Sequence, residues 1–218
     1  MRGIILLIVS VMLSVCFLHA SDGFLVKNPD LHKEGKTIEA FVPAGWKIIK
    51  RGAGDLNGDS LDDIVGVIEC TQPMASPDEA PPRILFIAFR RGSSYELSIQ
   101  ADSAIMKADE GGVFGDPFSV LKVENGTLLI GFYGGSAWRW SCEYRFKYIN
   151  KSWRLIAVIS GSYEPSGAMI TREHNLLAGQ VKTFRRDERG KESEQLSDAV
   201  EKELPRLENF RASSGCEN

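Results

Sequence analysis

Residues that most often carry catalysis are scarce in this sequence. It contains three histidines among 218 residues, and neither the H-E-x-x-H nor the G-x-S-x-G motif occurs. Ser119 and Lys122 have an S-x-x-K spacing, but they lie in a segment that we expect to be extended, where residues three apart face opposite sides. The sequence therefore gives little support to an enzyme, and we assign no catalytic residue.

A strong net charge is also absent. Lysine and arginine number 26 against 29 aspartates and glutamates, which leaves a formal charge of −3 at pH 7. Nucleic acids and anionic membrane surfaces are bound mainly through basic surfaces. We therefore expect neither as a partner, and the partner classes left open are a protein or a glycan.

The N-terminus has the pattern of a signal peptide. Arg2 precedes an apolar run at residues 4–18, and the small residue Ala20 offers a cleavage site, so we predict a leader over residues 1–20. The run is shorter than the roughly 20 residues of a membrane-spanning helix, and we expect no transmembrane segment in the mature chain. The protein is predicted to be exported, to the periplasm or the extracellular space. Cys16 does not follow a small residue, which is a poor match to a lipidation signal and leaves lipidation open.

Cleavage would leave an odd number of cysteines. Cys70, Cys142 and Cys216 remain, which suggests one disulfide and one free thiol. Cys216 stands close to the C-terminus, where chains are often poorly ordered, whereas Cys70 and Cys142 lie in strand-like segments. The sequence favours pairing of these two, with buried free thiols as the alternative.

Strand signals dominate between residues 37 and 184. Residues 138–148 alternate between apolar and polar side chains over eleven positions, the pattern of a half-buried strand. Residues 83–91 are nearly all apolar in their centre, which predicts a strand buried on both faces. Asn125-Gly126 and residues 150–152 each separate two such segments and predict hairpin turns.

Short turns between successive strands indicate an antiparallel meander. We predict one all-β domain over residues 21–210, with about ten to twelve strands in a sandwich or a partial propeller-like arrangement, followed by a disordered tail at residues 211–218. Two local predictions go with it. Residues 36–42 alternate as a strand, and residues 197–204 form a short helix with Ser197 as its N-cap.

An acidic loop lies between two of the predicted strands, within the sequence GAGDLNGDSLDDIVGVIE. Oxygen ligands occur there at alternate positions, from four side chains and one backbone carbonyl: Asp55, Asn57, Asp59, the carbonyl of Leu61, and Asp63. Calcium takes six to eight oxygen ligands, and alternate residues of a tight loop can all turn inward. The spacing predicts a site for one calcium ion, with a solvated turn as the alternative.

The acidic loop resembles the calcium loop of FG-GAP repeats, which joins two strands in integrin-type β-propellers through a D-x-[DN]-x-D-G-x-x-D sequence. Asp55, Asn57, Asp59 and Asp63 match that pattern, and Ser60 stands where it has glycine. The resemblance implies calcium bound between two strands. The wider chain is similar to a family of exported bacterial proteins that shares the acidic loop, GGVFGDPF and YGGSAWRWSCEYRFKY, and this similarity implies no activity.

A second candidate region combines GGVFGDPF with FYGGSAWRW. Asp116 belongs to the first stretch, and Tyr133 and Arg139 belong to the second. Tyrosine, tryptophan and arginine are enriched at binding hot spots, so Tyr133 and Arg139 are candidate binding residues. Asp116 is the third candidate, with a turn at Asp116-Pro117 as the alternative. Trp138 and Trp140 share the apolar side of the predicted strand and are expected in the core.

The leading hypothesis is an exported all-β binding or interaction module that is stabilised by one calcium ion. The alternative is a secreted hydrolase with a cleft near Asp116 and Arg139. The sequence names no ligand, partner or oligomeric state.

Overall fold

The computed structural model describes residues 27–199, 203–213 and 216. The predicted signal peptide, including Cys16, lies outside the described residues. The described chain is all-β, as the alternating patterns predict, and its twelve strands form two antiparallel sheets of five and seven strands. Among the described residues, no helix is long and apolar enough to cross a membrane.

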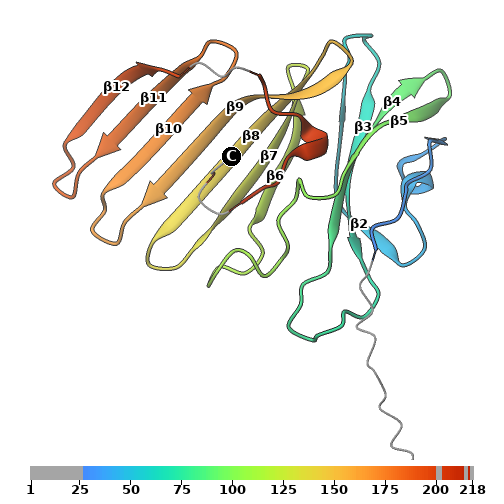
Figure 1. The fold of residues 1–218 in the computed structure, drawn as a ribbon, viewed down its shortest axis with the longest axis horizontal. Coiled ribbons are helices and arrows are strands. Elements are labelled where there is room, and N and C mark those ends of the chain that lie inside the picture. The colour runs from blue at the N-terminus through green and yellow to red at the C-terminus, as the bar shows by residue number, and fades with distance from the viewer. Residues whose placement is uncertain (1–26, 200–202, 214–215, 217–218) are drawn as a thin grey trace, which may run out of the picture.

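The second sheet is a meander, as expected from short turns, and the first is one over β2 to β5, with β1 added beside β5. The first sheet has the order β1-β5-β4-β3-β2 and consists of β1 (Glu34–Gly35), β2 (Trp46–Gly54), β3 (Asp63–Cys70), β4 (Arg83–Arg91) and β5 (Ser94–Ala101). The second has its strands in reverse chain order and consists of β6 (Phe118–Glu124), β7 (Thr127–Gly135), β8 (Arg139–Ile149), β9 (Ser152–Tyr163), β10 (Met169–Asn175), β11 (Gln180–Arg186) and β12 (Glu192–Asp198). Figure 1 shows the second sheet spread out, with β12 at its far end and the first sheet beside β6.

Two predicted hairpin turns are confirmed. Asn125 and Gly126 join β6 to β7 with φ angles of 51° and 67°. Asn150 and Lys151 join β8 to β9 with φ angles of 50° and 61°. Positive φ at both central residues is the signature of a type I′ turn, whose twist matches that of the flanking strands.

The main core lies between the two sheets. It contains apolar residues of β3, β4, β7, β8 and β9, among them Val65, Val67, Leu85, Ile87, Leu128, Ile130, Tyr144, Phe146 and Leu155. A smaller cluster covers the other face of the first sheet and includes Phe41, Ile68, Ile84 and Phe86. Strands β3 and β4 are therefore buried on both faces, which explains the nearly continuous apolar sequence of β4.

A C-terminal strap, residues 203–213, closes the core over the second sheet. The backbone N–H of Leu155 donates to Pro205 O at 2.9 Å, and Phe210 packs edge-on against both Tyr144 and Phe146. The strap contains the 3₁₀ turn η2 (Leu207–Asn209), in which Leu207 is fully buried. It lies in front of the second sheet in Figure 1.

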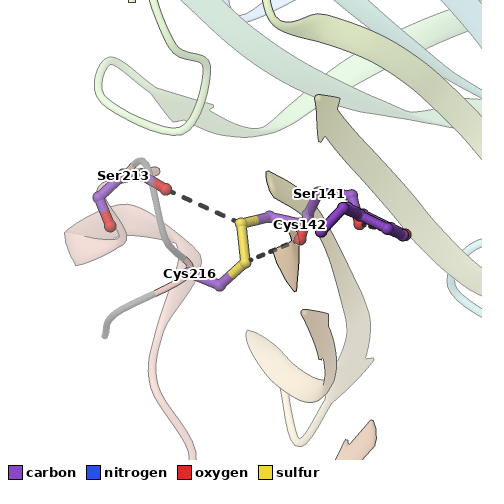
Figure 2. Close-up of a disulfide and its surroundings, with 5 residues drawn as sticks. Ser141, Cys142, Ser213 and Cys216 are labelled. Atoms are coloured by element: carbon purple, nitrogen blue, oxygen red, sulfur yellow. Dashed lines mark hydrogen bonds between the residues drawn. A yellow bond between two sulfur atoms is a disulfide. The ribbon is translucent and has the colours of Figure 1, made fainter. Parts of the chain in front are cut away.

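The cysteine pairing differs from the sequence-based preference. Cys142 of β8 is bonded to Cys216, with a Cα–Cα distance of 5.6 Å, and Cys70 is a buried free thiol. Figure 2 shows the bond between the sulfurs of Cys142 and Cys216, with Ser213 of the strap nearby. Ala212, in the stretch that we expected to be a disordered tail, is also buried. The sequence pattern could not show this because the strap reaches Cys142 only through tertiary packing.

Two local predictions are wrong. The 3₁₀ turn η1 (Ile38–Phe41) replaces the strand expected at residues 36–42, because Phe41 is the buried side chain and stacks on Phe86 at 5.6 Å. Ser197 does not cap a helix but lies within β12, where it pairs with Val181. Pairing with β11 supplies the hydrogen bonds that an isolated short helix would lack.

Candidate functional site

Exposed apolar side chains gather at one end of the second sheet. The aromatic corner, as we call it, consists of Val113, Phe114, Tyr133, Trp138 and Arg139. Val113 is 78% exposed, Trp138 58% and Phe114 49%. The ring of Phe114 meets that of Tyr133 edge-on at 5.3 Å, so the loop before β6 and the end of β7 form one surface. Large apolar side chains exposed together often mark an interaction site.

Backbone hydrogen bonds hold the loop of the aromatic corner against β7. The N–H of Val113 donates to Gly135 O at 3.0 Å, and the N–H of Gly135 donates to Gly111 O at 2.9 Å. A Cβ on Gly111 would lie only 1.9 Å from Gly115 O, and Gly135 has a φ of 114°. These two positions therefore require glycine, which accounts for the glycines in both sequence stretches.

A buried arginine fastens the other end of the loop. Both terminal nitrogens of Arg83 donate to the Asp116 carboxylate, at 2.8 and 2.6 Å. Arg83 also donates to Glu69 at 2.8 and 2.9 Å and to Met106 O at 2.9 Å, and its side chain is 2% exposed. A bidentate arginine–carboxylate pair fixes orientation as well as distance. The loop that presents Val113 and Phe114 is therefore tied to the first sheet.

The charges in this network stabilise each other. The hydrogen bonds from Arg83 lower the pKa of Asp116 below its ordinary value, against the smaller opposing effect of burial. The N–H of Phe118 also donates to Asp116 at 3.0 Å. Asp116 is therefore ionised and engaged, which suits an anchor and does not suit a general acid.

The structure brings the three predicted binding residues to one region but gives them different roles. Tyr133 and Arg139 stand on the same face of neighbouring strands, since Tyr133 pairs with Ser141 and Arg139 with Gly135. Arg139 is exposed. Asp116 points to Arg83 and anchors the loop, although its side chain is 45% exposed.

The structure places Trp138 differently from the prediction and adds Val113, Phe114 and Arg83, which the sequence did not single out. Trp138 was expected in the core, but β7 ends at Gly135, whose partner is Arg139, so no strand lies opposite Trp138. Its carbonyl instead accepts from Ser136 N–H at 2.7 Å in the turn. By contrast, Trp140 packs against the core as predicted. The glycines around Val113 and Phe114 were the available signal that this segment forms a tight, exposed loop.

The hydrolase alternative gains no support from this geometry. Its proposed acidic residue, Asp116, is held by Arg83 on both carboxylate oxygens. Pockets of about 620 and 660 Å³ lie along the C-terminal strap and include residues such as Arg211, but neither Asp116 nor Arg139 lines them.

The acidic loop has a tight conformation that its own side chains hold. Asp55 accepts from the N–H groups of Ser60, at 2.9 Å, and Gly58, at 2.7 Å, and these bonds lower its pKa. Asn57 accepts from Asp59 N–H at 2.9 Å. Gly58 and Ser60 have φ angles of 84° and 65°, so the loop bends at both positions, and Ser60 adopts the conformation for which the FG-GAP pattern uses glycine.

Asp63 links the acidic loop to β4. Its carboxylate is fully buried and accepts from Leu56 N–H and Arg90 N–H, both at 2.9 Å. Burial is the main reason that its pKa is raised, and the neighbouring charges of Asp59 and Asp55 add to the effect. Asp59 is 3.5 Å from the guanidinium of Arg91.

The donor set fits calcium in chemical type. Asp55, Asn57, Asp59, Asp63 and the Leu61 carbonyl all offer oxygen, and the loop joins two strands as the resemblance implies. Among the described residues, no three acidic, histidine or cysteine side chains converge closely enough to form a metal cluster in this conformation. A calcium ion would therefore turn carboxylate oxygens that now accept backbone N–H bonds toward itself.

The two candidate regions lie at opposite ends of β7. Gly126 at its start is close to the Asp55 carbonyl, at 3.9 Å from an added Cβ, and Gly135 at its end supports the aromatic corner. Nine residues of strand separate them by roughly 25–30 Å. An ion in the acidic loop would consequently act on stability and would not touch a ligand at the aromatic corner.

The chain matches no protein-family model, no curated protein and no solved structure.

Proposed function

We propose that this protein is an exported all-β binding module that contacts a partner protein through the aromatic corner. The observation that carries the proposal is the combination of exposure and anchoring. Val113, Phe114 and Trp138 are at least 49% exposed. The loop of Val113 and Phe114 is nevertheless held by Arg83 and by backbone bonds to β7, and Trp138 lies in the β7–β8 turn, where its carbonyl accepts from Ser136 N–H. A surface that is already ordered loses little conformational freedom when it binds.

A protein fits this surface better than a glycan. Glycan recognition needs several polar groups that can bond to hydroxyls, and two of the polar groups in this region are engaged within the protein: Asp116 by Arg83, and Ser136 N–H by the Trp138 carbonyl. Val113 is aliphatic and is the most exposed of the large apolar side chains in the described residues. The corner therefore suits an apolar pocket, with an acidic group beside it to meet Arg139.

Calcium has a supporting role in the proposal. The acidic loop connects β2 to β3, and Asp63 fixes it to β4. An ion that neutralises Asp55, Asp59 and Asp63 would relieve their mutual repulsion and hold the three strands together. Export agrees with this role, because calcium is more abundant outside cells and a disulfide persists there.

The proposal is tested by comparing matched surface variants. Val113→Ser with Trp138→Ser removes the two most exposed apolar groups of the corner, while Leu177→Ser removes one of similar exposure outside both proposed binding surfaces. A purified partner, identified by capture from the exported fraction, should bind the wild type and the Leu177→Ser variant equally and the corner variant at least tenfold more weakly. Equal binding by all three would refute the proposed surface, and Trp138-dependent binding to a glycan array would replace the protein with a glycan.

A further inference from the structure

We propose that the open edge of β12 binds an extended, lysine- or arginine-bearing segment of a partner protein, which adds to the second sheet as an antiparallel strand. This site is separate from the aromatic corner, because four strands, β8 to β11, lie between β12 and β7. The proposal rests on three features of β12: its open backbone, its regular geometry and its charge.

The other edges of the two sheets carry features that hinder the addition of a strand. β1 pairs over only two residues. β2 and β6 each contain a register shift, at Ile48/Lys50 and at Phe118/Val120, and they lie against each other where Lys50 bonds to the Ser119 carbonyl. Short strands, bulges and covering contacts are the usual protection of sheet edges.

β12 lacks these structural forms of protection. It runs for seven residues without proline or glycine, pairs in unbroken register with β11, and is exposed at every position. Within the described part of the chain, β11 is the strand with which it pairs. An edge of this length and regularity can accept a further strand through main-chain hydrogen bonds.

The register identifies which backbone groups are open. Ala199 N–H donates to Gly179 O at 2.8 Å, so the backbone groups at 199 face β11. Successive residues of a strand point their N–H and C=O groups to opposite sides. The groups that face away from β11 therefore belong to Glu192, Glu194, Leu196 and Asp198.

The acidic side chains of β12 favour a partner segment that carries basic residues. The four residues with open backbone groups also share one face of the sheet, and three of them are acidic. Lys182 of β11 neutralises Glu194 at 3.0 Å, but no ion pair at 4 Å or less is formed within the described residues by Glu192 or Asp198. Two copies of β12 would place like charges opposite each other, whereas a strand with basic residues at alternate positions would be attracted.

The probe is a labelled peptide designed for this register. In antiparallel pairing, acetyl-Lys-Thr-Val-Thr-Lys-Thr-Lys-amide places lysines opposite Asp198, Glu194 and Glu192 and valine opposite Leu196. We expect saturable binding by fluorescence anisotropy at up to millimolar peptide, together with slower amide exchange at those four residues. The same peptide with glutamate for each lysine should not bind.

Proline scanning separates edge pairing from simple charge attraction. Glu194→Pro removes an N–H that faces away from β11, a position where proline is tolerated in edge strands, and should leave the fold intact. The Glu194→Pro variant should bind the lysine peptide at least about tenfold more weakly, because one hydrogen bond is lost and the edge is interrupted. A neutral Glu194→Gln variant serves as its matched control and should lose less affinity. If Glu194→Pro does not fold, two methylated probes are compared instead. In the designed register the valine N–H points to Leu196 and the central threonine N–H points away from β12. N-methylation at the valine should therefore abolish binding, whereas N-methylation at the threonine should not.

The proposal would be overturned by any of three results. These are no saturable binding of the lysine peptide, equal binding of the lysine and glutamate peptides, or binding that persists unchanged in folded Glu194→Pro or with both methylated probes. Each of these would show that β12 is an edge kept soluble by its charge and does not accept a strand.

Discussion

The disulfide between Cys142 and Cys216 should contribute a large part of the stability of the oxidised protein. The cross-link joins residues 74 apart in sequence and holds the end of the C-terminal strap on β8. On the chain-entropy model, closing a loop of this length destabilises the unfolded state by about 4.4 kcal/mol. Cys216→Ser removes the cross-link at a residue that is only partly buried, and serine differs from cysteine by one atom, so this entropic term should dominate its effect.

The assay is urea unfolding of oxidised wild type and Cys216→Ser, followed by tryptophan fluorescence. With a slope of about 2 kcal/mol per molar urea, the midpoint should fall by about 2 M. Cys70→Ala is the matched control, because it removes a buried thiol without touching the bridge and should cost on the order of 1 kcal/mol. Thiol titration of the unfolded wild type, without the leader, should find one free cysteine.

Two results would refute this reasoning. One is an unchanged midpoint in Cys216→Ser, which would mean that the strap is held without the bridge and that the unfolded chain gains nothing from its loss. The other is a peptide map that links Cys142 to Cys70, which would restore the pairing favoured by sequence and contradict the structure.

Three further predictions concern the acidic loop, the anchor of the aromatic corner and a hairpin. Millimolar calcium should raise the melting temperature of the wild type by a few degrees relative to chelator, since about 1 kcal/mol shifts the melting temperature of a domain of this size by roughly 2–4 °C. The double variant Asp55→Ala with Asp59→Ala should abolish this shift. If the wild type melts identically with calcium and with chelator and calorimetry shows no binding, the loop is a plain turn. Because Arg83 lowers the pKa of Asp116, the ion pair stabilises the fold fully at pH values above the ordinary pKa of 3.8, and this contribution is lost as the pH falls through the lower folded-state pKa. The difference in unfolding free energy between wild type and Asp116→Asn, measured by urea unfolding, should therefore become smaller on acidification. A difference that does not change with pH would contradict the ion pair. Gly126→Val should cost more than about 1 kcal/mol, because a β-branched residue is unfavourable at a φ of 67°; an unchanged melting temperature would place the turn elsewhere.

The sequence predicted the strands better than it predicted the surfaces. Alternation in β8 and the Asn125-Gly126 turn are local signals, because pleating and positive φ act on adjacent residues. The pairing of Cys142 with Cys216 depends on the path of the strap across the second sheet, which no local pattern encodes. Trp138 continues the alternation of β8 but lies beyond the end of β7, so whether it is buried was decided by its neighbouring strand and not by its own sequence.

The candidate sites likewise differ in whether their residues are close together in sequence or are brought together only by the fold. The oxygens of the acidic loop were visible because they lie close together in sequence, whereas the positive φ of Ser60 was not expected there. The aromatic corner joins two distant stretches, and its anchor Arg83 comes from a third. Arg83 opens a nearly continuous apolar strand, and nothing in that strand indicates that its guanidinium would be buried against Asp116 and Glu69.

Site-specific photo-crosslinking in the producing cell tests the binding role of the aromatic corner most directly. Val113→p-benzoylphenylalanine places the probe on the most exposed apolar position of the corner, and Leu177→p-benzoylphenylalanine places it at a matched exposed position elsewhere. The account predicts one defined cross-linked protein, identified by mass spectrometry, with the probe at 113 and its absence with the probe at 177. No cross-linked protein at 113, or the same protein at both positions, would contradict the account.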